Sequence, residues 1–291
     1  MQVPHTTPAE WAGVDAGRFA AFMRADRPEG CTVALLGLPD DTGVKLNQGR
    51  PGAARGPAAF RQALSRLGAA EPAGHLWPRV FDAGNVKPGA SLHETHGRVT
   101  AATAALLDLG LLPVAIGGGH DLTFPFVRAV AGKTGALAGV YFDAHLDVRE
   151  TDGSGMAFRR LVDECGVWGL HLHGFQPLVN SEQHYAWFET HGGRAHEPRE
   201  APALPEGASP LFVSFDLDVI DMAFAPGVSA PNPAGWTSRE AEGWVSACGA
   251  DPRVRCFDLM ELSPPYDEGG RTARLAAHLF LTFLAGVASR P

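Results

Sequence analysis

Short apolar runs recur along the chain, and each is bounded by Gly, Pro or Asp. Strands that are apolar on both faces and alternate with helical segments are typical of a mainly parallel sheet with helices on both sides. The runs predict strands at residues 32–36, 80–82, 112–116, 138–142, 166–172, 211–215 and 254–259. Apolar residues at helical spacing predict helices at residues 57–67, 92–109, 123–131, 238–247 and 271–288.

The length of the chain, 291 residues, exceeds the usual size of one domain, but α/β proteins often use such a length for a single core. No repeat or low-complexity tract interrupts the alternation. The Pro/Ala-rich stretch 198–209 is predicted to be a surface loop, because an apolar strand resumes directly after it. We therefore expect one α/β domain over residues 1–291.

The composition is typical of a globular protein and does not indicate binding to nucleic acid. Hydrophobic residues make up 45% of the chain, and 24 Lys and Arg stand against 32 Asp and Glu, a net charge of −8. Without a basic run, nucleic acid is not an expected partner. The first residues lack the basic and apolar regions of a signal peptide. The apolar stretch 275–289 is shorter than the roughly 20 residues that cross a bilayer, so no membrane contact is expected.

The four cysteines, Cys31, Cys165, Cys248 and Cys256, stand far apart and form no CxxC pair. A chain of this length does not depend on disulfides. Reduced thiols and a cytoplasmic location are therefore expected.

Three predicted strands continue into Asp and His residues. The strand at 138–142 is followed by Asp143, His145 and Asp147, which alternate and therefore project to one side of an extended chain. In open α/β sheets, ligands bind beyond the carboxyl ends of the strands. A single Asp there is more often a helix cap or turn residue, but three clusters together favour a metal site. The candidate ligands are His120, Asp143, His145, Asp147, Asp216 and Asp218.

Gathering these carboxylates at the edge of an apolar core requires positive charge. Two carboxylates 4 Å apart repel by about 4 kcal/mol at an effective dielectric constant near 20. Two divalent cations would neutralise the four aspartates. Oxygen ligands without thiolate favour manganese or magnesium over structural zinc, and the imidazoles shift the preference towards manganese, iron or cobalt. The prediction is two Mn²⁺ per chain.

The other histidines are not expected to bind metal. His171 and His173 alternate along a predicted strand without neighbouring carboxylates, which favours a structural role. The remaining ones lie in predicted helices or loops and are expected at the surface; they include His93, His96, His184, His191 and His196.

Several motifs resemble those of the ureohydrolases, the family of arginase, agmatinase and formimidoylglutamase. They are GGGHD at 117–121, DAHLD at 143–147 and SFDLDVID at 214–221, the last followed by APG at 225–227. The segments 40–61 and 257–267 extend the resemblance to essentially the whole chain. It implies a three-layer α/β/α fold with a mainly parallel, roughly eight-stranded sheet. It also implies two manganese ions bridged by hydroxide and held by the six candidate ligands.

The resemblance further implies roles for single residues. Asp147 would accept the proton of the hydroxide and pass it to the leaving nitrogen, and Glu261 would hold the cationic amidinium group of the substrate. Ser214 would support the ligands from behind. The family also suggests a homo-oligomer, a trimer or a hexamer.

Within the family, the sequence is most similar to the formimidoylglutamases. The GGGH motif is followed by the acidic Asp121, and Phe158 stands where arginases carry a proton-shuttle histidine. The expected reaction is hydrolysis of N-formimino-L-glutamate to L-glutamate and formamide, as in histidine degradation. Its two carboxylates call for guanidinium donors. The candidate substrate-binding residues are Arg149, Arg159, Arg160 and Asn180, with a surface role at least as well supported for Arg159 and Arg160.

Two alternatives stay open at this stage. Another ureohydrolase specificity, for agmatine, arginine or a guanidino acid, would use the same metal ligands. A non-catalytic metal-binding scaffold would keep the fold alone; it is disfavoured because all six ligand positions and Glu261 are occupied by competent residues.

Overall fold

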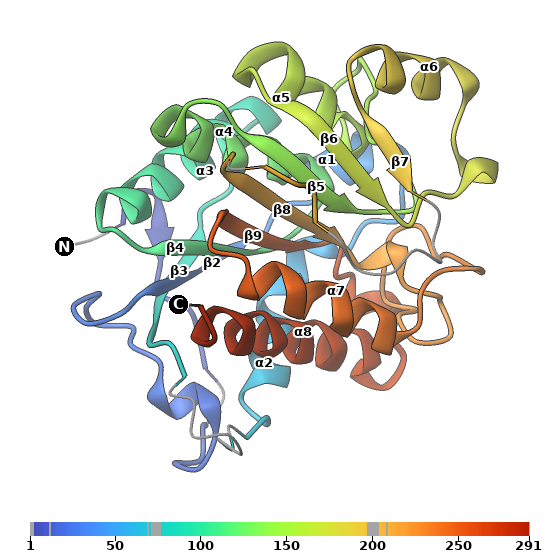
Figure 1. The fold of residues 1–291 in the computed structure, drawn as a ribbon. Coiled ribbons are helices and arrows are strands. Elements are labelled where there is room, and N and C mark those ends of the chain that lie inside the picture. The colour runs from blue at the N-terminus through green and yellow to red at the C-terminus, as the bar shows by residue number, and fades with distance from the viewer. Residues whose placement is uncertain are drawn as a thin grey trace.

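The computed structural model describes residues 3–11, 13–68, 70, 77–196, 204–207 and 209–290. Its strands form one nine-stranded sheet in the order β1-β3-β2-β4-β9-β8-β5-β6-β7 (Figure 1). Every neighbouring pair is parallel except β1 with β3. The strands are β1 (Thr6–Thr7), β2 (Val33–Leu38), β3 (Val80–Val86), β4 (Leu112–Gly117), β5 (Ala138–Phe142), β6 (Trp168–His173), β7 (Arg194–His196), β8 (Leu211–Asp216) and β9 (Val254–Met260).

Helices cover both faces of the sheet, so that the molecule has three layers (Figure 1). Helices α2, α7 and α8 pack on one face, and α3, α4 and α5 pack on the other. The helices are α1 (Thr42–Leu46), α2 (Gly56–Leu64), α3 (Leu92–Asp108), α4 (Thr123–Thr134), α5 (Ala157–Cys165), α6 (Glu182–Thr190), α7 (Ser238–Ala250) and α8 (Arg271–Ala288). The predicted three-layer α/β/α fold is confirmed, with nine strands where about eight were expected.

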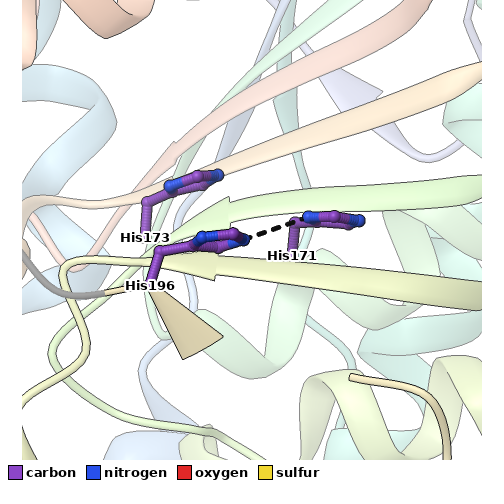
Figure 2. A group of neighbouring side chains, drawn as sticks. All are labelled: His171, His173 and His196. Carbon is purple, nitrogen blue, oxygen red and sulfur yellow. Dashed lines mark hydrogen bonds between the residues drawn. The ribbon is translucent and has the colours of Figure 1, made fainter. Parts of the chain in front are cut away.

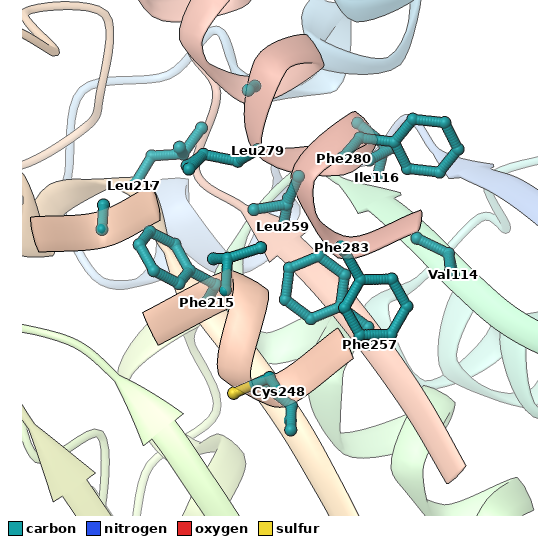
Figure 3. Close-up of a cluster of buried hydrophobic side chains, with 14 of the residues drawn as sticks. Val114, Ile116, Phe215, Leu217, Cys248, Phe257, Leu259, Leu279, Phe280 and Phe283 are labelled. Carbon is teal, nitrogen blue, oxygen red and sulfur yellow. The ribbon is translucent and has the colours of Figure 1, made fainter. Parts of the chain in front are cut away.

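The central strands are apolar on both faces because each face has its own hydrophobic core. Along β9, Phe257 and Leu259 point to α7 and α8, whereas Cys256 and Met260 point to the opposite core. Figure 3 shows the first core, where Phe283 of α8 stacks on Phe257 with ring centroids 4.3 Å apart. This two-sided burial explains the unbroken apolar runs in the sequence.

All the predicted strands and helices are present, with ends that differ by a few residues. Five short elements were missed, namely β1, β7, α1, α5 and α6. The predicted loop at 198–209 lies largely outside the described residues. The apolar stretch 275–289 forms most of the buried helix α8. No helix in the described part of the chain is long and apolar enough to cross a membrane. All four cysteines are free thiols, as expected.

The sheet order brings four strand ends together. Strands β4, β9, β8 and β5 are consecutive neighbours and parallel, so their carboxyl ends lie at one edge of the sheet. The loop after β4 approaches other backbone so closely that a Cβ on Gly118 would overlap the carbonyl oxygen of Asp40. Glycine is therefore required at this position. The residues that follow these four strands form the candidate site.

Candidate metal centre

The first group of the site surrounds His120, which directly follows the glycine loop. Its Nδ1 atom lies 3.0 Å from Oδ2 of Asp143, 3.0 Å from Oδ2 of Asp147 and 3.1 Å from Oδ2 of Asp216. These residues come from the ends of β4, β5 and β8. One imidazole nitrogen and three carboxylate oxygens thus face a common point.

The second group surrounds His145. Its Nδ1 atom lies 3.2 Å from Oδ1 of Asp143 and 3.0 Å from Oδ2 of Asp218. Asp143 belongs to both groups, since one of its oxygens faces His120 and the other faces His145. The six predicted ligands therefore make two adjacent clusters that share one aspartate.

Buried polar atoms in this site fit a cation. Nδ1 of His120 and Oδ2 of Asp143 are buried and lie 3.0 Å apart without the geometry of a hydrogen bond, and neither has another hydrogen-bond partner among the described residues. Leaving such a group without a partner costs about 1–3 kcal/mol. Burial, with the negative charges of Asp218 and Asp147, raises the pKa of Asp143 to about 6. A divalent cation would satisfy the orphaned atoms and offset the charge, and this set of mostly oxygen ligands suits manganese.

A buried hydrogen-bond chain orients the ring of His120. The Oγ of Ser214 lies 3.0 Å from Nε2 of His120 and donates its hydrogen to Oδ1 of Asp258 at 2.6 Å. Because that hydrogen is used, Ser214 accepts from Nε2–H, and the lone pair of Nδ1 points at the carboxylates. Asp258 was not singled out in the sequence; its register pairing with Ser214 across β8 and β9 reveals it.

Two site residues have strained backbones. Asp147 (φ 48°) and Glu261 (φ 66°) are two of the four described non-glycine residues with positive φ. Such conformations cost about 1–3 kcal/mol each and concentrate at functional sites. Glu261 is buried, and its Oε1 accepts a hydrogen bond from the backbone N–H of His120 at 2.8 Å, while Oε2 has no partner among the described residues. Burial raises the pKa of Glu261 to about 8.

A cavity of about 370 Å³ opens onto the two clusters. Its volume is that of a small-metabolite site. Besides five of the six candidate ligands, the cavity is lined by Asn47, Gly49, Val148, Arg149, Ser154, Val179, Asn180, Ser181, His184, Ser229, Ala230 and Glu261.

The family model described as "Arginase family" matches residues 31–286. The chain belongs to the arginase family. Formimidoylglutamase of Aeromonas hydrophila is 35% identical over 271 residues, which cover 85% of this chain and 84% of that protein. The mitochondrial guanidino acid hydrolase of Homo sapiens is 32% identical over 288 residues, covering 89% and 79%.

The solved structure of Trypanosoma cruzi formiminoglutamase with Mn²⁺ matches with a TM-score of 0.88 and 30% identity, covering 94% of this chain and 99% of that one. Membership of the arginase family places the chain among hydrolases that act on amidine or guanidino groups.

In this arginase-family chain, the three candidate arginines have different surroundings. Arg149 lines the cavity, and its guanidinium makes no ion pair with any described residue. Arg159 instead pairs with Glu150 at 3.0 Å, and Arg160 pairs with Glu164 at 2.8 Å. Neither of these two lines the cavity. The structure therefore favours a surface role for Arg159 and Arg160 and leaves Arg149 as the substrate-binding candidate.

Asn180 lines the cavity, but its amide is hydrogen-bonded to the loop that carries the candidate ligands Asp143, His145 and Asp147. Its Oδ1 accepts from the backbone N–H of Leu146 at 2.9 Å, and its Nδ2 donates to the carbonyl oxygens of Ala144 and Gln176, both at 2.9 Å. Both amide hydrogens are thus engaged. Asn180 has no donor left for a substrate and is better described as a residue that positions the loop between Asp143 and Asp147.

Several histidines differ from expectation. The prediction that His96 lies at the surface is wrong: it is buried, and its Nε2 lies 2.8 Å from Oδ2 of Asp121. His184, also expected at the surface, is half-buried on α6 and lines the cavity. His196 lies in strand β7 and is half-buried. Phe158 is buried with its ring edge-on to His120, so this position contributes packing.

The cavity residues that the sequence did not single out include Asn47, Ser229 and His184. Asn47 belongs to the N-terminal segment that resembles the family, and Ser229 follows the third motif closely. Asn47 and Ser229 could therefore have been predicted from the family motifs that lie beside them in the sequence. The sequence around His184 does not indicate a site residue. His184 reaches the cavity only through the position of α6 in the fold.

Proposed function

We propose that this protein hydrolyses N-formimino-L-glutamate to L-glutamate and formamide. The observation that carries the proposal is the pairing, around one cavity, of the buried acid Glu261 with the exposed guanidinium of Arg149, which makes no ion pair within the described part of the chain. The substrate carries a cationic amidine group, which matches Glu261, and two carboxylates, one of which matches Arg149. The similarity to the Aeromonas enzyme and to the Trypanosoma structure supports the same substrate.

We propose two Mn²⁺ as the cofactors, held by His120, Asp143, His145, Asp147, Asp216 and Asp218. A pair of such cations lowers the pKa of water and polarises an sp² carbon. The partly exposed Asp147 takes the proton of the attacking water and delivers it to the leaving nitrogen. The water oxygen bonds to the amidine carbon, and the bond from that carbon to the glutamate nitrogen breaks. Glu261 holds the amidinium throughout.

A guanidino acid is the second candidate substrate, supported by the 32% identity to the human guanidino acid hydrolase. It has one cationic carbon–nitrogen group and a carboxylate, so Arg149 and Glu261 fit it as well, and the preference for N-formimino-L-glutamate rests on the formimidoylglutamases among the similar proteins. Agmatine has no carboxylate and leaves Arg149 without a partner. The products distinguish the candidates, because guanidino substrates release urea and a formimidoyl substrate releases formamide.

The test is a substrate panel with the purified, manganese-loaded protein. N-formimino-L-glutamate, a guanidino acid, arginine and agmatine are compared by release of formamide, urea and the amine product. We expect kcat/KM for N-formimino-L-glutamate to exceed the others by at least about tenfold, a modest discrimination for a charged site. Faster urea release from the guanidino acid would establish the second candidate. No turnover of any substrate at full metal content would support the non-catalytic scaffold.

Replacing Arg149 with Ala is expected to raise KM for N-formimino-L-glutamate by about 10- to 100-fold, because a charge-assisted hydrogen bond contributes about 1.5–3 kcal/mol. Steady-state kinetics would measure the change. Arg160→Ala is the matched control, since Arg160 pairs with Asp152 and Glu164 at the surface and its loss should leave KM unchanged. Unchanged KM in the Arg149 variant would remove its proposed role.

The assembly, a trimer or hexamer, stays a prediction, as do the single domain over residues 1–291 and the cytoplasmic location. Light scattering on the eluting peak of a size-exclusion column would give the number of chains directly.

A further inference from the structure

Three histidines gather on one face of the sheet at its β7 edge. His171 and His173 alternate along β6 and therefore share a face, and His196 of β7 pairs in register with His173 (Figure 2). One ring nitrogen from each residue lies within 4.8 Å of the other two. The sequence pattern gave the first two a structural role and did not connect them with His196.

His173 is the buried member of this cluster. Its ring lies between those of Trp244, with centroids 4.2 Å apart, and His196, at 4.3 Å. Its side chain is buried, and neither Nδ1 nor Nε2 has a hydrogen-bond partner among the described residues. Native proteins rarely leave buried polar atoms unsatisfied, so two such atoms on one ring point to a ligand.

His171 and His196 complete the cluster from the half-buried side. Nδ1 of His171 lies 3.1 Å from Nε2 of His196 (Figure 2). Burial lowers the pKa of His171 to about 4, with further lowering by His196 and Arg194. His171 is therefore neutral near pH 7, which is the form of imidazole that binds metals.

We propose that His171, His173 and His196 form a second metal site, which takes one late first-row divalent cation such as Zn²⁺. Three imidazoles, with no carboxylate grouped with them among the described residues, favour zinc, copper or nickel over manganese, in contrast to the oxygen-rich pair of clusters beyond the strand ends. Three protein ligands leave a fourth position for water or another donor. The site is independent of the proposed hydrolytic function.

The rings must turn to bind an ion. The ring of His196 is nearly parallel to those of His173 and His171, with interplanar angles of 9° and 13°, whereas in-plane lone pairs must converge on the metal. The χ2 torsion of histidine is broad, and the half-buried rings of His171 and His196 are the ones with room to turn. Zinc–nitrogen bonds of about 2.0–2.1 Å in a tetrahedral site place the ligand nitrogens about 3.3 Å apart, close to the 3.1 Å between Nδ1 of His171 and Nε2 of His196.

A zinc ion bound by these three histidines would cross-link β6 and β7 at the edge of the sheet. Strand β7 has three residues and, among the described strands, pairs only with β6. A bound ion would tie both strands through side chains and stabilise the folded state in proportion to its occupancy. Zinc binding should therefore raise the Tm of the manganese-loaded protein.

The experiment titrates the manganese-loaded protein with Zn²⁺ against a chromophoric chelator, followed by desalting and analysis of both metals. We expect one zinc per chain in addition to the manganese, with no manganese lost, and a higher Tm. If each zinc ion taken up displaces a manganese ion, zinc binds at the clusters around His120 and His145 instead of at the three histidines. That result would overturn the proposal. The absence of any zinc uptake would overturn it as well.

Two variants locate the site, namely His171→Gln and His196→Gln. Each should weaken zinc binding by at least about 100-fold, since losing even a partner that only orients a ligand costs about 10- to 100-fold. His93→Gln, at an exposed position on α3, is the matched control and should bind zinc as the wild type does. Unchanged manganese content and circular dichroism show that a variant is folded. Folded variants that keep the wild-type zinc affinity would contradict the assignment.

Discussion

Replacing Asp143 with Asn is expected to lower kcat/KM by at least about 10³-fold and to strip manganese from the protein, because several kcal/mol of metal-dependent stabilisation are lost. Asp143 is the one residue whose two oxygens face both histidine-centred clusters. Asparagine keeps the shape but removes the charge and one acceptor. The loss should therefore affect both cation positions at once, and metal analysis together with steady-state kinetics would show it.

The matched control for this substitution is Asp163→Asn, an equal change of charge at an exposed position on α5. Its metal content and rate should equal those of the wild type. An Asp143→Asn protein that retained two manganese ions and nearly full activity would show that the shared aspartate does not bridge the clusters, and the proposed centre would be wrong.

Replacing Glu261 with Gln is expected to reduce kcat/KM by about 10²- to 10³-fold, comparable to removing one charge-stabilising group from an active site. The buried carboxylate faces the cavity with one oxygen unpartnered among the described residues. An amidinium group can supply that partner, whereas the neutral amide of Gln holds it poorly. The metal content should stay unchanged, which separates this effect from that of Asp143→Asn.

The same variant has a consequence for stability in the metal-free protein. Burial raises the pKa of Glu261 from 4.5 to about 8, so between these pH values the folded state binds more protons than the unfolded state. The free energy of unfolding must then fall as the pH rises through this window. In chelator-treated protein, Glu261→Gln should make the free energy of unfolding fall less steeply with pH. Denaturant unfolding at several pH values would measure the change. The control Glu164→Gln, at an exposed position on α5, should leave this pH dependence as it is in the wild type.

Much of the metal centre could be predicted from the sequence, because a strand that is buried on both faces must be apolar until it ends. The first polar residues after β5, Asp143 and its alternating neighbours, therefore stand out. Asp258 could not be found in this way. It lies inside β9 among apolar residues, and only the lateral pairing with Ser214 shows that it supports His120.

Side-chain direction was the main source of error. Arg149, Arg159 and Arg160 all follow the metal-binding strand, but Arg159 and Arg160 lie on α5, where the side chains turn with the helix towards acidic neighbours. His96 was expected at the surface only because it lies in a predicted helix. The contact that buries it, Asp121, comes from 25 residues further along the chain.

The positive φ angles of Asp147 and Glu261 place a limit on how this protein can be made more robust. At each position glycine would adopt the same backbone conformation and relieve about 1 kcal/mol of strain, although Glu261→Gly would also remove the hydrogen bond from the backbone N–H of His120. Relief of backbone strain would thus act against the two side chains that we propose to move the proton and to hold the cation. Stability and catalytic activity therefore make opposite demands on Asp147 and Glu261. A stabilised variant that stays active must gain its stability from substitutions at other positions.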